Sequence, residues 1–384
     1  MMNTLHGLAG PAVSRRVPIV TTSIIARILD SQREMIRVFC MALWFPLICV
    51  SLVGCEHSTS PIVPLSSNEI IYGDTDGFIY TIDTDGSHRK KLFTVQAQLP
   101  ACSPKGDLIS AYWFDETDNH EWLVVFDVNN GVMRKLAYVM GLNEPLMETC
   151  SWSPDGLTLA FNRSQGTLGE SDLFTVDREG KTVRQLTSGG INFGPTWSPN
   201  GRMIAYYVYN GKSTFSHVMN ADGSDDKAPP YRPSGLVSSL SWSPDGASVV
   251  FHGPPDSTFI GTAADDIYIS DSEGRQVRKL TNDGLSAAPA WSPDGEFIAF
   301  VSGRDGGWNI YVMRRDGSSP TRLTKHGKVL GGPLLWSPDG TKLLYAYDAK
   351  SQYGLSIGVA DSDGSHDMSI NVSAIGGFAW KQRQ

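Results

Sequence analysis

The chain has 384 residues, of which 41% are hydrophobic and 19% charged, so it can bury a sizeable core within a single domain. Its formal net charge is -8, and it becomes -11 when the first 55 residues, with five arginines against Asp30 and Glu34, are set aside. Phosphate binding needs clustered lysine and arginine side chains, so this acidic balance argues against a nucleic acid partner.

The first 55 residues have the pattern of an export signal. Residues 1–34 have modest hydrophobicity and no sustained periodicity. From Met35 the pattern changes, because Arg37 precedes an apolar run of 13 residues, Val38–Val50, which only Pro46 interrupts. This order is typical of a secretory signal. The run is short for a membrane-spanning anchor, the less favoured alternative, because a bilayer core of about 30 Å needs roughly 20 apolar residues.

The end of this segment, Leu52-Val53-Gly54-Cys55, resembles the lipobox of bacterial lipoproteins. The resemblance implies that residues 35–55 are a lipoprotein signal peptide and that Cys55 is acylated and becomes the mature N-terminus. Residues 1–34 are then interpreted as a non-structural extension or a gene-model artefact. In that class, Glu56 rather than aspartate after the cysteine implies the outer membrane of a host with two membranes. Residues 56–68 are rich in serine and proline and predict a flexible tether.

The rest of the chain, residues 69–382, is predicted to be one domain because it repeats a short motif. The clearest copy is Trp291-Ser292-Pro293-Asp294-Gly295, and Cys102-Ser103-Pro104-Lys105-Gly106 is a degenerate copy. The first motif residues lie at 102, 152, 197, 242, 291 and 336, so the spacings are 50, 45, 45, 49 and 45 residues. This period is about the length of one four-stranded blade of a β-propeller.

The motif itself predicts a hairpin turn that follows a buried tryptophan. Proline has the fixed φ that the second turn position favours, aspartate or asparagine tolerates the next position, and glycine adopts a conformation that side chains resist. Phe297 and Ile298 begin an apolar strand, which predicts that both of its faces are covered. The structural motif residues are Trp152, Pro154, Gly156, Trp197, Pro199, Gly201, Trp242, Pro244, Gly246, Trp291, Pro293, Gly295, Trp336, Pro338, Gly340 and Trp380.

The two ends of the repeat array are complementary. After Glu69 the chain has three predicted strands with no inner strand before them, whereas Gly376–Trp380 reads as an inner strand with nothing after it. We therefore expect the last strand to pair with the first three, which would close the ring and remove free sheet edges. Counting inner strands predicts an all-β fold with seven blades, and six is the alternative if the degenerate copy forms none.

These repeats resemble those of the TolB family, also called WD40-like or PD40 repeats. The resemblance rests on Trp-Ser-Pro-Asp-Gly, on the Ile310-Tyr311 strand and on Leu323-Thr324, and it covers residues 69–380. It implies a propeller, and its members include translocation proteins, propeller domains of peptidases and lyase-like enzymes. TolB itself carries an α/β domain before its propeller, whereas a signal and a tether precede this one, so the resemblance does not imply a Tol-Pal assembly.

No catalytic or metal-binding constellation is evident in the sequence. Gly354-Leu355-Ser356-Ile357-Gly358 matches the serine hydrolase elbow in letters, but it lies in predicted middle strands with no helical pattern after it. His88 and His366 follow equivalent hairpins, and the other histidines have no ligand spacing. The Asp-Thr-Asp-Gly type of hairpin lacks the remaining ligands of a calcium loop. We therefore expect no catalytic residues, no metal and no cofactor.

The cysteines divide between the signal and the domain. Cys40 and Cys49 leave with the signal, and Cys102 and Cys150 fall on inner strands of consecutive repeats. An exported protein permits a disulfide between this pair, but spacing alone does not bring the Cα atoms within the roughly 7 Å that a disulfide needs. Two buried thiols are the favoured interpretation, and the disulfide stays an alternative.

The combined interpretation is a lipid-anchored, exported, monomeric propeller that binds an envelope protein or a glycan through one face and the mouth of its channel. A metal-dependent polysaccharide lyase or another propeller enzyme is the alternative. A purely structural envelope component is a third.

We predict that translation starts at Met35, because the signal pattern begins there. N-terminal peptide mapping of the precursor should place the first residue at position 35. Recovery of peptides from residues 3–33 in the mature protein would contradict this interpretation.

Overall fold

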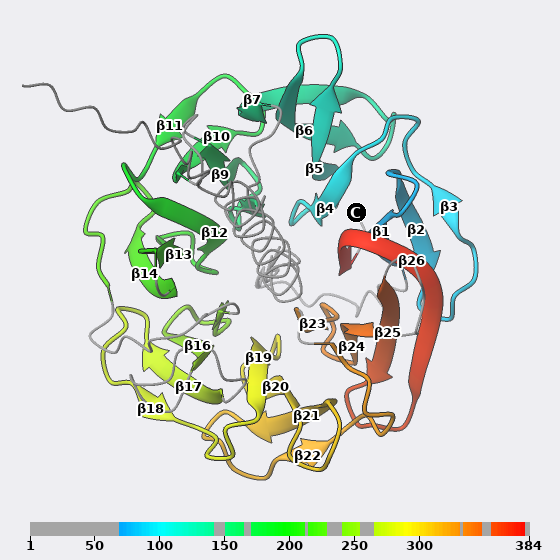
Figure 1. Cartoon of the computed structure of the whole chain (residues 1–384), viewed down its shortest axis with the longest axis vertical. Coiled ribbons are helices and arrows are strands. Elements are labelled where there is room, and N and C mark those ends of the chain that lie inside the picture. The colour runs from blue at the N-terminus through cyan, green and yellow to red at the C-terminus, as the bar shows by residue number, and fades with distance from the viewer. Residues whose placement is uncertain are drawn as a thin grey trace, which may run out of the picture. The chain divides into compact units, whose positions relative to one another are not determined.

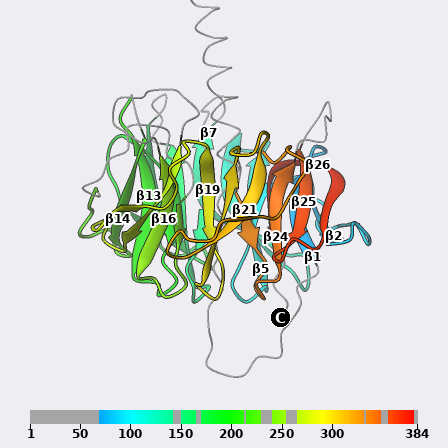
Figure 2. The same ribbon diagram turned by 90° about the horizontal axis from the view of Figure 1, so that it is seen from below.

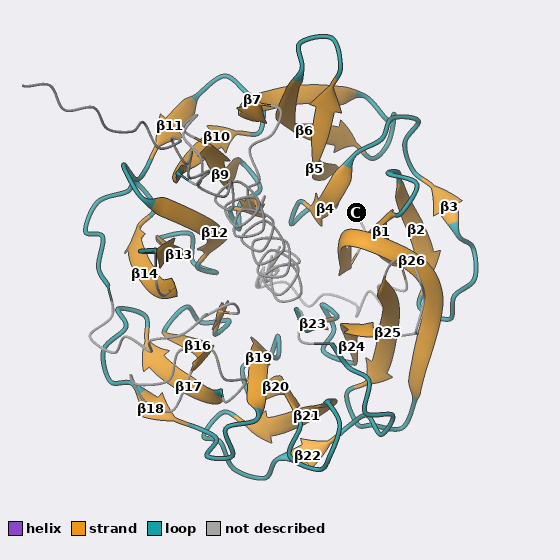
Figure 3. Ribbon diagram, in the orientation of Figure 1, coloured by secondary structure: helices purple, strands orange, loops and turns teal. Residues whose placement is uncertain are grey.

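The computed structural model describes residues 69–141, 150–164, 170–211, 214–228, 240–253, 265–330, 333–347 and 355–380. These residues all belong to one compact domain within Phe45–Gln384. They form strands and loops (Figure 3), and none of them lies in a helix that could cross a membrane. The predicted extension, signal peptide and tether, with Cys55, lie outside the described residues.

Short strands follow one another along the whole of this domain, as the repeated turn motif predicts. The strands are β1 (Glu69–Asp74), β2 (Ile79–Asp83), β3 (Lys90–Lys91), β4 (Gln98–Cys102), β5 (Leu108–Asp115), β6 (His120–Asp127), β7 (Met133–Gly141), β8 (Cys150–Trp152), β9 (Thr158–Ser164), β10 (Ser171–Asp177), β11 (Val183–Gln185), β12 (Ile191–Trp197), β13 (Met203–Tyr209), β14 (Thr214–Asn220), β15 (Leu240–Trp242), β16 (Ser248–Gly253), β17 (Asp266–Asp271), β18 (Arg278–Lys279), β19 (Ser286–Trp291), β20 (Phe297–Ser302), β21 (Asn309–Arg314), β22 (Thr321–Arg322), β23 (Leu335–Trp336), β24 (Lys342–Tyr347), β25 (Leu355–Asp361) and β26 (Asp367–Trp380).

The strands form antiparallel sheets that lie one after another around a central region (Figure 1), and the strands run between two faces (Figure 2). Among the described residues, three sheets have four strands, in the orders β4-β5-β6-β7, β15-β16-β17-β18 and β19-β20-β21-β22. We call such a set of four successive strands a unit. Two longer sheets join neighbouring units: β8–β11 connects to β12–β14 through one parallel pair, Ser171 with Ile191, and the other sheet contains both ends of the domain.

The sheet that contains both ends has the order β23-β24-β25-β26-β1-β2-β3. The last strand pairs antiparallel with the first, with Ile70 opposite Trp380 and Tyr72 opposite Phe378. The sequence predicted this pairing but a shorter strand, Gly376–Trp380. β26 instead has 14 residues, because it first pairs with β25 as an outer strand and then bends to pair with β1.

The Ser-Pro-Asp-Gly turn forms because its side chains bond to its own backbone. In the copy after Trp152, Ser153 Oγ donates to Asp155 Oδ1 at 2.6 Å and accepts from the backbone N–H of Thr158 at 3.0 Å. Gly156 has a φ of 69°, in the left-handed region that glycine adopts readily. These bonds account for the motif as turn chemistry.

The degenerate copy after Cys102 keeps this chemistry by a different route. Lys105 stands where the other copies have aspartate or asparagine. Here Ser103 Oγ donates to Asp107 Oδ1 at 2.7 Å, so a carboxylate two residues further on takes the same role. The other oxygen of that carboxylate accepts from Arg178 Nη2 of the next unit at 2.6 Å.

The repeated tryptophans connect neighbouring units. The indole N–H of Trp242 donates to the carbonyl oxygen of Thr196, on the inner strand of the preceding unit, at 3.3 Å. Trp152, Trp336 and Trp380 donate in the same way to Ala101, Ala290 and Leu335 at 3.3, 3.1 and 3.1 Å. Among the described residues, the buried indole N–H groups of Trp197 and Trp291 have no such acceptor.

The two-sided burial predicted for the strand after Trp291 holds only in part. Ile298 and Phe300 are fully buried, but the side chain of Phe297 is 36% exposed. Phe297 is the first residue of β20 and directly follows the turn, so it lies at the end of the sheet rather than between two layers. Arg314, opposite it on β21, covers part of its ring.

We predict that the indole hydrogen bond distinguishes two otherwise similar tryptophans. Trp242 and Trp291 are both 6% exposed, so Trp242→Phe and Trp291→Phe remove similar buried volume. Only Trp242 donates to a backbone carbonyl, so Trp242→Phe should lower the free energy of unfolding by about 1 kcal/mol more than Trp291→Phe. Urea unfolding of both variants measures the difference. Equal losses would show that the bond between units contributes nothing.

Candidate functional site

The outer hairpins pack closely on the preceding unit at most junctions. A methyl group added at Gly180 would lie 3.1 Å from Cα of Leu136, and one at Gly223 would lie 3.1 Å from the carbonyl oxygen of Leu186. Gly317 against Leu280 and Gly364 against Leu323 repeat this contact with backbone atoms, at 3.2 and 3.6 Å. At these four junctions the glycine of the hairpin therefore lies directly against its neighbour, whereas a methyl group added at Gly131, in the β6–β7 hairpin, would meet nothing within 4 Å.

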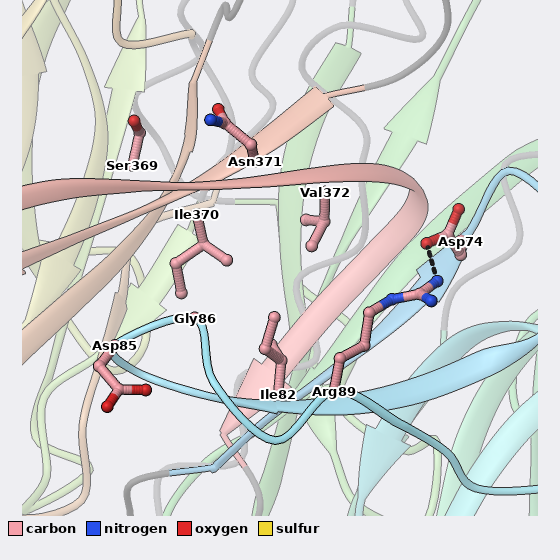
Figure 4. A pocket seen from close by; sticks show the side chains of 9 residues that line it. All are labelled: Asp74, Ile82, Asp85, Gly86, Arg89, Ser369, Ile370, Asn371 and Val372. Carbon is pink, nitrogen blue, oxygen red and sulfur yellow. Dashed lines mark hydrogen bonds and ion pairs between the residues drawn. The ribbon is translucent and has the colours of Figure 1, made fainter.

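The junction at Gly86, in the hairpin between β2 and β3, is looser. The nearest atom to a methyl group added there is a side-chain atom, Cγ2 of Ile370, at 3.7 Å. A cleft of about 450 Å³ lies between this hairpin and β26. We call it the junction cleft (Figure 4), and it is lined by Asp74, Ile82, Asp85, Gly86, Arg89, Ser369, Ile370, Asn371 and Val372.

The cleft forms where a repeated hydrogen bond is replaced. In three units the threonine of a Leu-Thr pair accepts from the backbone N–H at the start of the third strand. Leu173 N donates to Thr187 Oγ1, Ile267 N to Thr281 Oγ1 and Ile310 N to Thr324 Oγ1, each at 2.9 Å. The residue before each of these donors is Asp172, Asp266 or Asn309, and each accepts from the same threonine hydroxyl.

The last unit has different residues at both of these positions. Thr324 lies 15 residues after Asn309, and the residue 15 after Ser356 is Asn371. Ser356 therefore occupies the aspartate or asparagine position and Asn371 the threonine position. Asn371 is exposed, and Ser356 Oγ donates to the carbonyl oxygen of Val372 at 3.5 Å.

A β-bulge accompanies this replacement. Ile370 lies opposite Ile357, but the next aligned pair is Ala374 with Leu355, so residues 371–373 of β26 face the single residue Ser356. Figure 4 shows Ile370 and Val372 pointing toward the β2–β3 hairpin, whereas Ser369 and Asn371 point to the other side. Bulges re-aim side chains in this way and are common next to functional sites.

One end of the cleft holds a polar network, in which Tyr72 and Asp74 are buried and the side chain of Arg89 is 45% exposed. Arg89 Nη2 donates to Asp74 Oδ2 at 2.8 Å, and Arg89 Nε donates to the hydroxyl of Tyr72 at 2.8 Å. Burial alone would lower the pKa of Arg89, but these two hydrogen bonds outweigh it and raise that pKa. Burial raises the pKa of Tyr72, so its hydroxyl stays protonated. The carboxylate of Asp74 thus offsets the charge of the guanidinium.

The other end of the cleft is acidic. Asp85 Oδ1 accepts from the backbone N–H of Ser87 at 2.8 Å, and hydrogen bonds from Ser87 lower the pKa of Asp85. The carboxylate is therefore ionised at neutral pH. Its neighbour Asp83 pairs with His88 at 2.8 Å on the same hairpin.

The residues singled out from the sequence lie elsewhere or have structural roles. Ser356 is 2% exposed in the middle of a sheet, and no described helix follows it. Cys102 and Cys150 are both buried and no disulfide joins them, and burial raises the pKa of Cys150 to about 11. His366 pairs with Asp361 at 2.7 Å in a hairpin, as His88 does with Asp83.

The remaining titratable groups do not gather into a metal site within the described ranges, where no group of three or more histidine, cysteine or acidic side chains could hold an ion. His252 is buried and accepts from the backbone N–H of Ala288 at 3.3 Å. Burial lowers its pKa, although Asp265 lies 3.6 Å away.

Sequence reasoning missed the junction cleft. A signal was present in Ser356 and Asn371, because they break the spacing of Asp172 with Thr187 and of Asn309 with Thr324. Arg89 and Asp85 carried no signal of their own, since nothing near them in the sequence departs from a hairpin pattern. Their role depends on β26, nearly 300 residues away in the chain.

Comparison with known proteins identifies the type of repeat. A family model described as the TolB beta propeller domain, PD40, matches residues 75–260 and 194–374. The Tol-Pal system protein TolB of Geobacter sulfurreducens is 38% identical over 72 residues, which cover 19% of this chain and 16% of that protein. The matched segments span less than a third of the length of the curated relatives.

Solved structures agree with this fold. The crystal structure of TolB from Acinetobacter baumannii has a TM-score of 0.51 and 18% identity, and the match covers 82% of this chain and 67% of that one. An oligogalacturonate lyase in complex with manganese has a TM-score of 0.60 and 16% identity, covering 78% of this chain and 88% of that one. Identities this low show the fold alone, and these two matches are a TolB protein and an enzyme.

We predict that restoring the repeated pair in the last unit stabilises it. In Ser356→Asn with Asn371→Thr, the two new side chains match Asn309 and Thr324, so they should couple by about 1 kcal/mol in the free energy of unfolding. A double-mutant cycle by urea unfolding measures the coupling. The reverse changes, Asn309→Ser and Thr324→Asn, are the matched control and should lose a similar amount. Strictly additive effects at 356 and 371 would contradict the assignment of these positions.

Proposed function

Because the chain belongs to the TolB β-propeller family, we propose that it is a lipid-anchored binding protein of the bacterial cell envelope, without catalytic activity. Acylation at Cys55 would hold it at the outer membrane, facing the periplasm, with residues 56–68 as the tether. The Geobacter sulfurreducens relative is named as a component of the Tol-Pal system, which supports an envelope protein as the partner here.

We infer a monomeric propeller of seven blades. Seven inner-strand positions support this count: 102, 152, 197, 242, 291, 336 and 380. The antiparallel pairing of Ile70 with Trp380 supports closure through the last strand. Closure would give the domain a fixed surface without free inner edges, which suits a binding scaffold.

The observation that carries the binding role is the junction cleft. The polar residues of the repeat are used for turn and strand hydrogen bonds, as Ser153 and Thr187 illustrate. At the cleft, in contrast, the repeat is interrupted and charged side chains line an open volume of about 450 Å³. Clefts of this size with a few placed polar groups are common binding sites.

The alternative, a metal-dependent polysaccharide lyase, draws its support from the structural match to such an enzyme, which concerns the fold. It predicts unsaturated products from an acidic polysaccharide when a divalent cation is added. The binding role predicts that no such products form. Crosslinking the acylated protein in membranes, followed by its capture, would identify the partner that the binding role requires.

We predict that Cys55→Ser abolishes lipidation, because Cys55 is the only candidate acyl acceptor that the lipobox pattern indicates. Labelling cells with a clickable palmitate analogue should mark the natural protein and leave the variant unmarked and outside the membrane fraction. Cys49→Ser is the matched control, since it changes a cysteine of the same segment and should keep full labelling. Labelling that persists in Cys55→Ser would contradict the proposed acylation at Cys55.

A further inference from the structure

His326 lies in the connection between β22 and β23 and packs against the last unit. Its ring stacks on that of Tyr345 of β24, with the ring centroids 5.9 Å apart and the planes 17° apart. The ring of Tyr347 meets it edge-on, with the centroids 4.8 Å apart. The side chain of His326 is 24% exposed, so these contacts cover most of it.

Tyr345 lacks the aromatic partner that the same position has elsewhere. In the preceding unit, Phe300 lies opposite Tyr311 on the next strand, and the two rings stack with their centroids 5.7 Å apart. Gly358 lies opposite Tyr345, and a methyl group added there would lie 2.0 Å from Cζ of the tyrosine. The tyrosine ring therefore lies across β25, and His326 provides the ring that stacks on it.

Both nitrogens of the His326 ring have partners. Nδ1 accepts from the backbone N–H of Lys328 at 3.1 Å, so this nitrogen carries no hydrogen. The proton of the neutral ring is therefore on Nε2, which lies 3.1 Å from the hydroxyl of Tyr345. That hydroxyl donates to Oδ1 of Asp367, the first residue of β26. A continuous network thus joins the connection to two strands of the last unit.

The preceding connection forms the same turn with a carboxylate. Asp283 and His326 each lie two residues after the threonine of a Leu-Thr pair. Oδ1 of Asp283 accepts from the backbone N–H of Leu285 at 2.9 Å, and Oδ2 lies 2.7 Å from Nη2 of Arg304. Both turns need an unprotonated acceptor, but imidazole is the side chain that ordinarily gains a proton between about pH 7 and pH 5.

The surroundings of His326 oppose its protonation. Burial lowers the pKa of His326, and the positive charges of Lys328 and Arg322 lower it further, whereas Asp367, with Oδ2 3.5 Å from Nε2, raises it only in part. Burial also raises the pKa of Tyr345, so its hydroxyl remains a neutral donor. Because the pKa of His326 is lowered in the folded state, its contribution to stability is complete above the ordinary value of about 6.5 and is lost as the pH falls below it.

We propose that the turn at residues 326–328 is an acid-sensitive junction between the last two units. Protonation places a hydrogen on Nδ1 of His326, so the backbone N–H of Lys328 loses its acceptor and the turn opens. Leu330 follows this turn, and its backbone N–H donates to the carbonyl oxygen of Ala346 on β24 at 3.0 Å. Opening the turn therefore releases the connection from β24. This inference does not depend on the proposed binding role.

Hydrogen exchange of the full-length protein in detergent micelles, followed by mass spectrometry, tests the junction. The rates are first corrected for the intrinsic effect of pH on amide exchange. Peptides that cover residues 327–330 should then exchange about fivefold faster at about pH 5 than at about pH 7.5, the factor expected for one lost hydrogen bond. Residues 284–286, which follow the Asp283 turn, are the internal control and should keep their protection.

A matched pair of variants separates the titration from the turn. In His326→Asn the amide oxygen still accepts from Lys328 but does not titrate, so residues 327–330 should exchange at the same corrected rate at both pH values. His366→Asn is the control and should keep the acid response, since His366 is 79% exposed and pairs with Asp361 in a hairpin. Exchange of the imidazole C2 hydrogen gives the midpoint of His326 itself, which should lie below about 6.5.

Three results would overturn the proposal. Equal protection of residues 327–330 at both pH values in the natural protein would show that the turn tolerates a protonated ring. An acid response that persists in His326→Asn would assign that response to another group. A midpoint of His326 above about 6.5 would show that attraction to Asp367 dominates and that acid strengthens this junction. These results are independent of palmitate labelling and partner capture, so the binding role and this inference can fail separately.

Discussion

The pairing of the last strand with the first is the contact on which the rest of this structure depends. Ile70, Tyr72 and Trp380 pack in one hydrophobic cluster with Ile357 of the preceding unit, so the two ends of the domain share a core. Without β26, one edge of β1 would present unpaired backbone groups, which are a template for aggregation. The indole N–H of Trp380 also donates to the carbonyl oxygen of Leu335 on β23, the strand at the other end of the β23–β26 set.

The same contact shapes the junction cleft. β26 serves as an outer strand and then as an inner strand, so it bends at a bulge, residues 371–373, at the place where three other units have a Leu-Thr pair. The hairpin of the first unit then lacks the backbone support that Gly180 and Gly317 have. Both the junction cleft and its acidic end follow from this difference, since the hairpin carries Asp85.

The sequence predicted the strands and turns because the residues of the repeated motif indicate both a hairpin turn and a buried core position. The positive φ of Gly156 and the burial of Trp242 were both predicted from residue type and spacing, whereas the hydrogen bond of Trp242 to Thr196 was not. The pairing of the two ends was also predictable, by counting strands. The repeat says little about function for the same reason, because its polar residues are used within the fold.

The details that the sequence did not predict depend on distant contacts. The sequence indicated a strand only over Gly376–Trp380, yet β26 begins at Asp367, because its first residues pair with β25 before Phe378–Trp380 pair with β1. The position of Phe297 at the end of its sheet explains its exposure. The cleft combines residues 74–89 with 369–372, and no local pattern announces a contact of that kind.

Amide hydrogen exchange at the joined strands tests the central claim most directly. If β26 and β1 pair as described, the amides of Ile70–Tyr72 and Phe378–Trp380 should exchange as slowly as those of Phe300 and Ile310 in the middle of the β19–β22 sheet. Fast exchange at both ends, with slow exchange in that sheet, would show that the ends do not pair, and the cleft and the binding role drawn from it would have no basis.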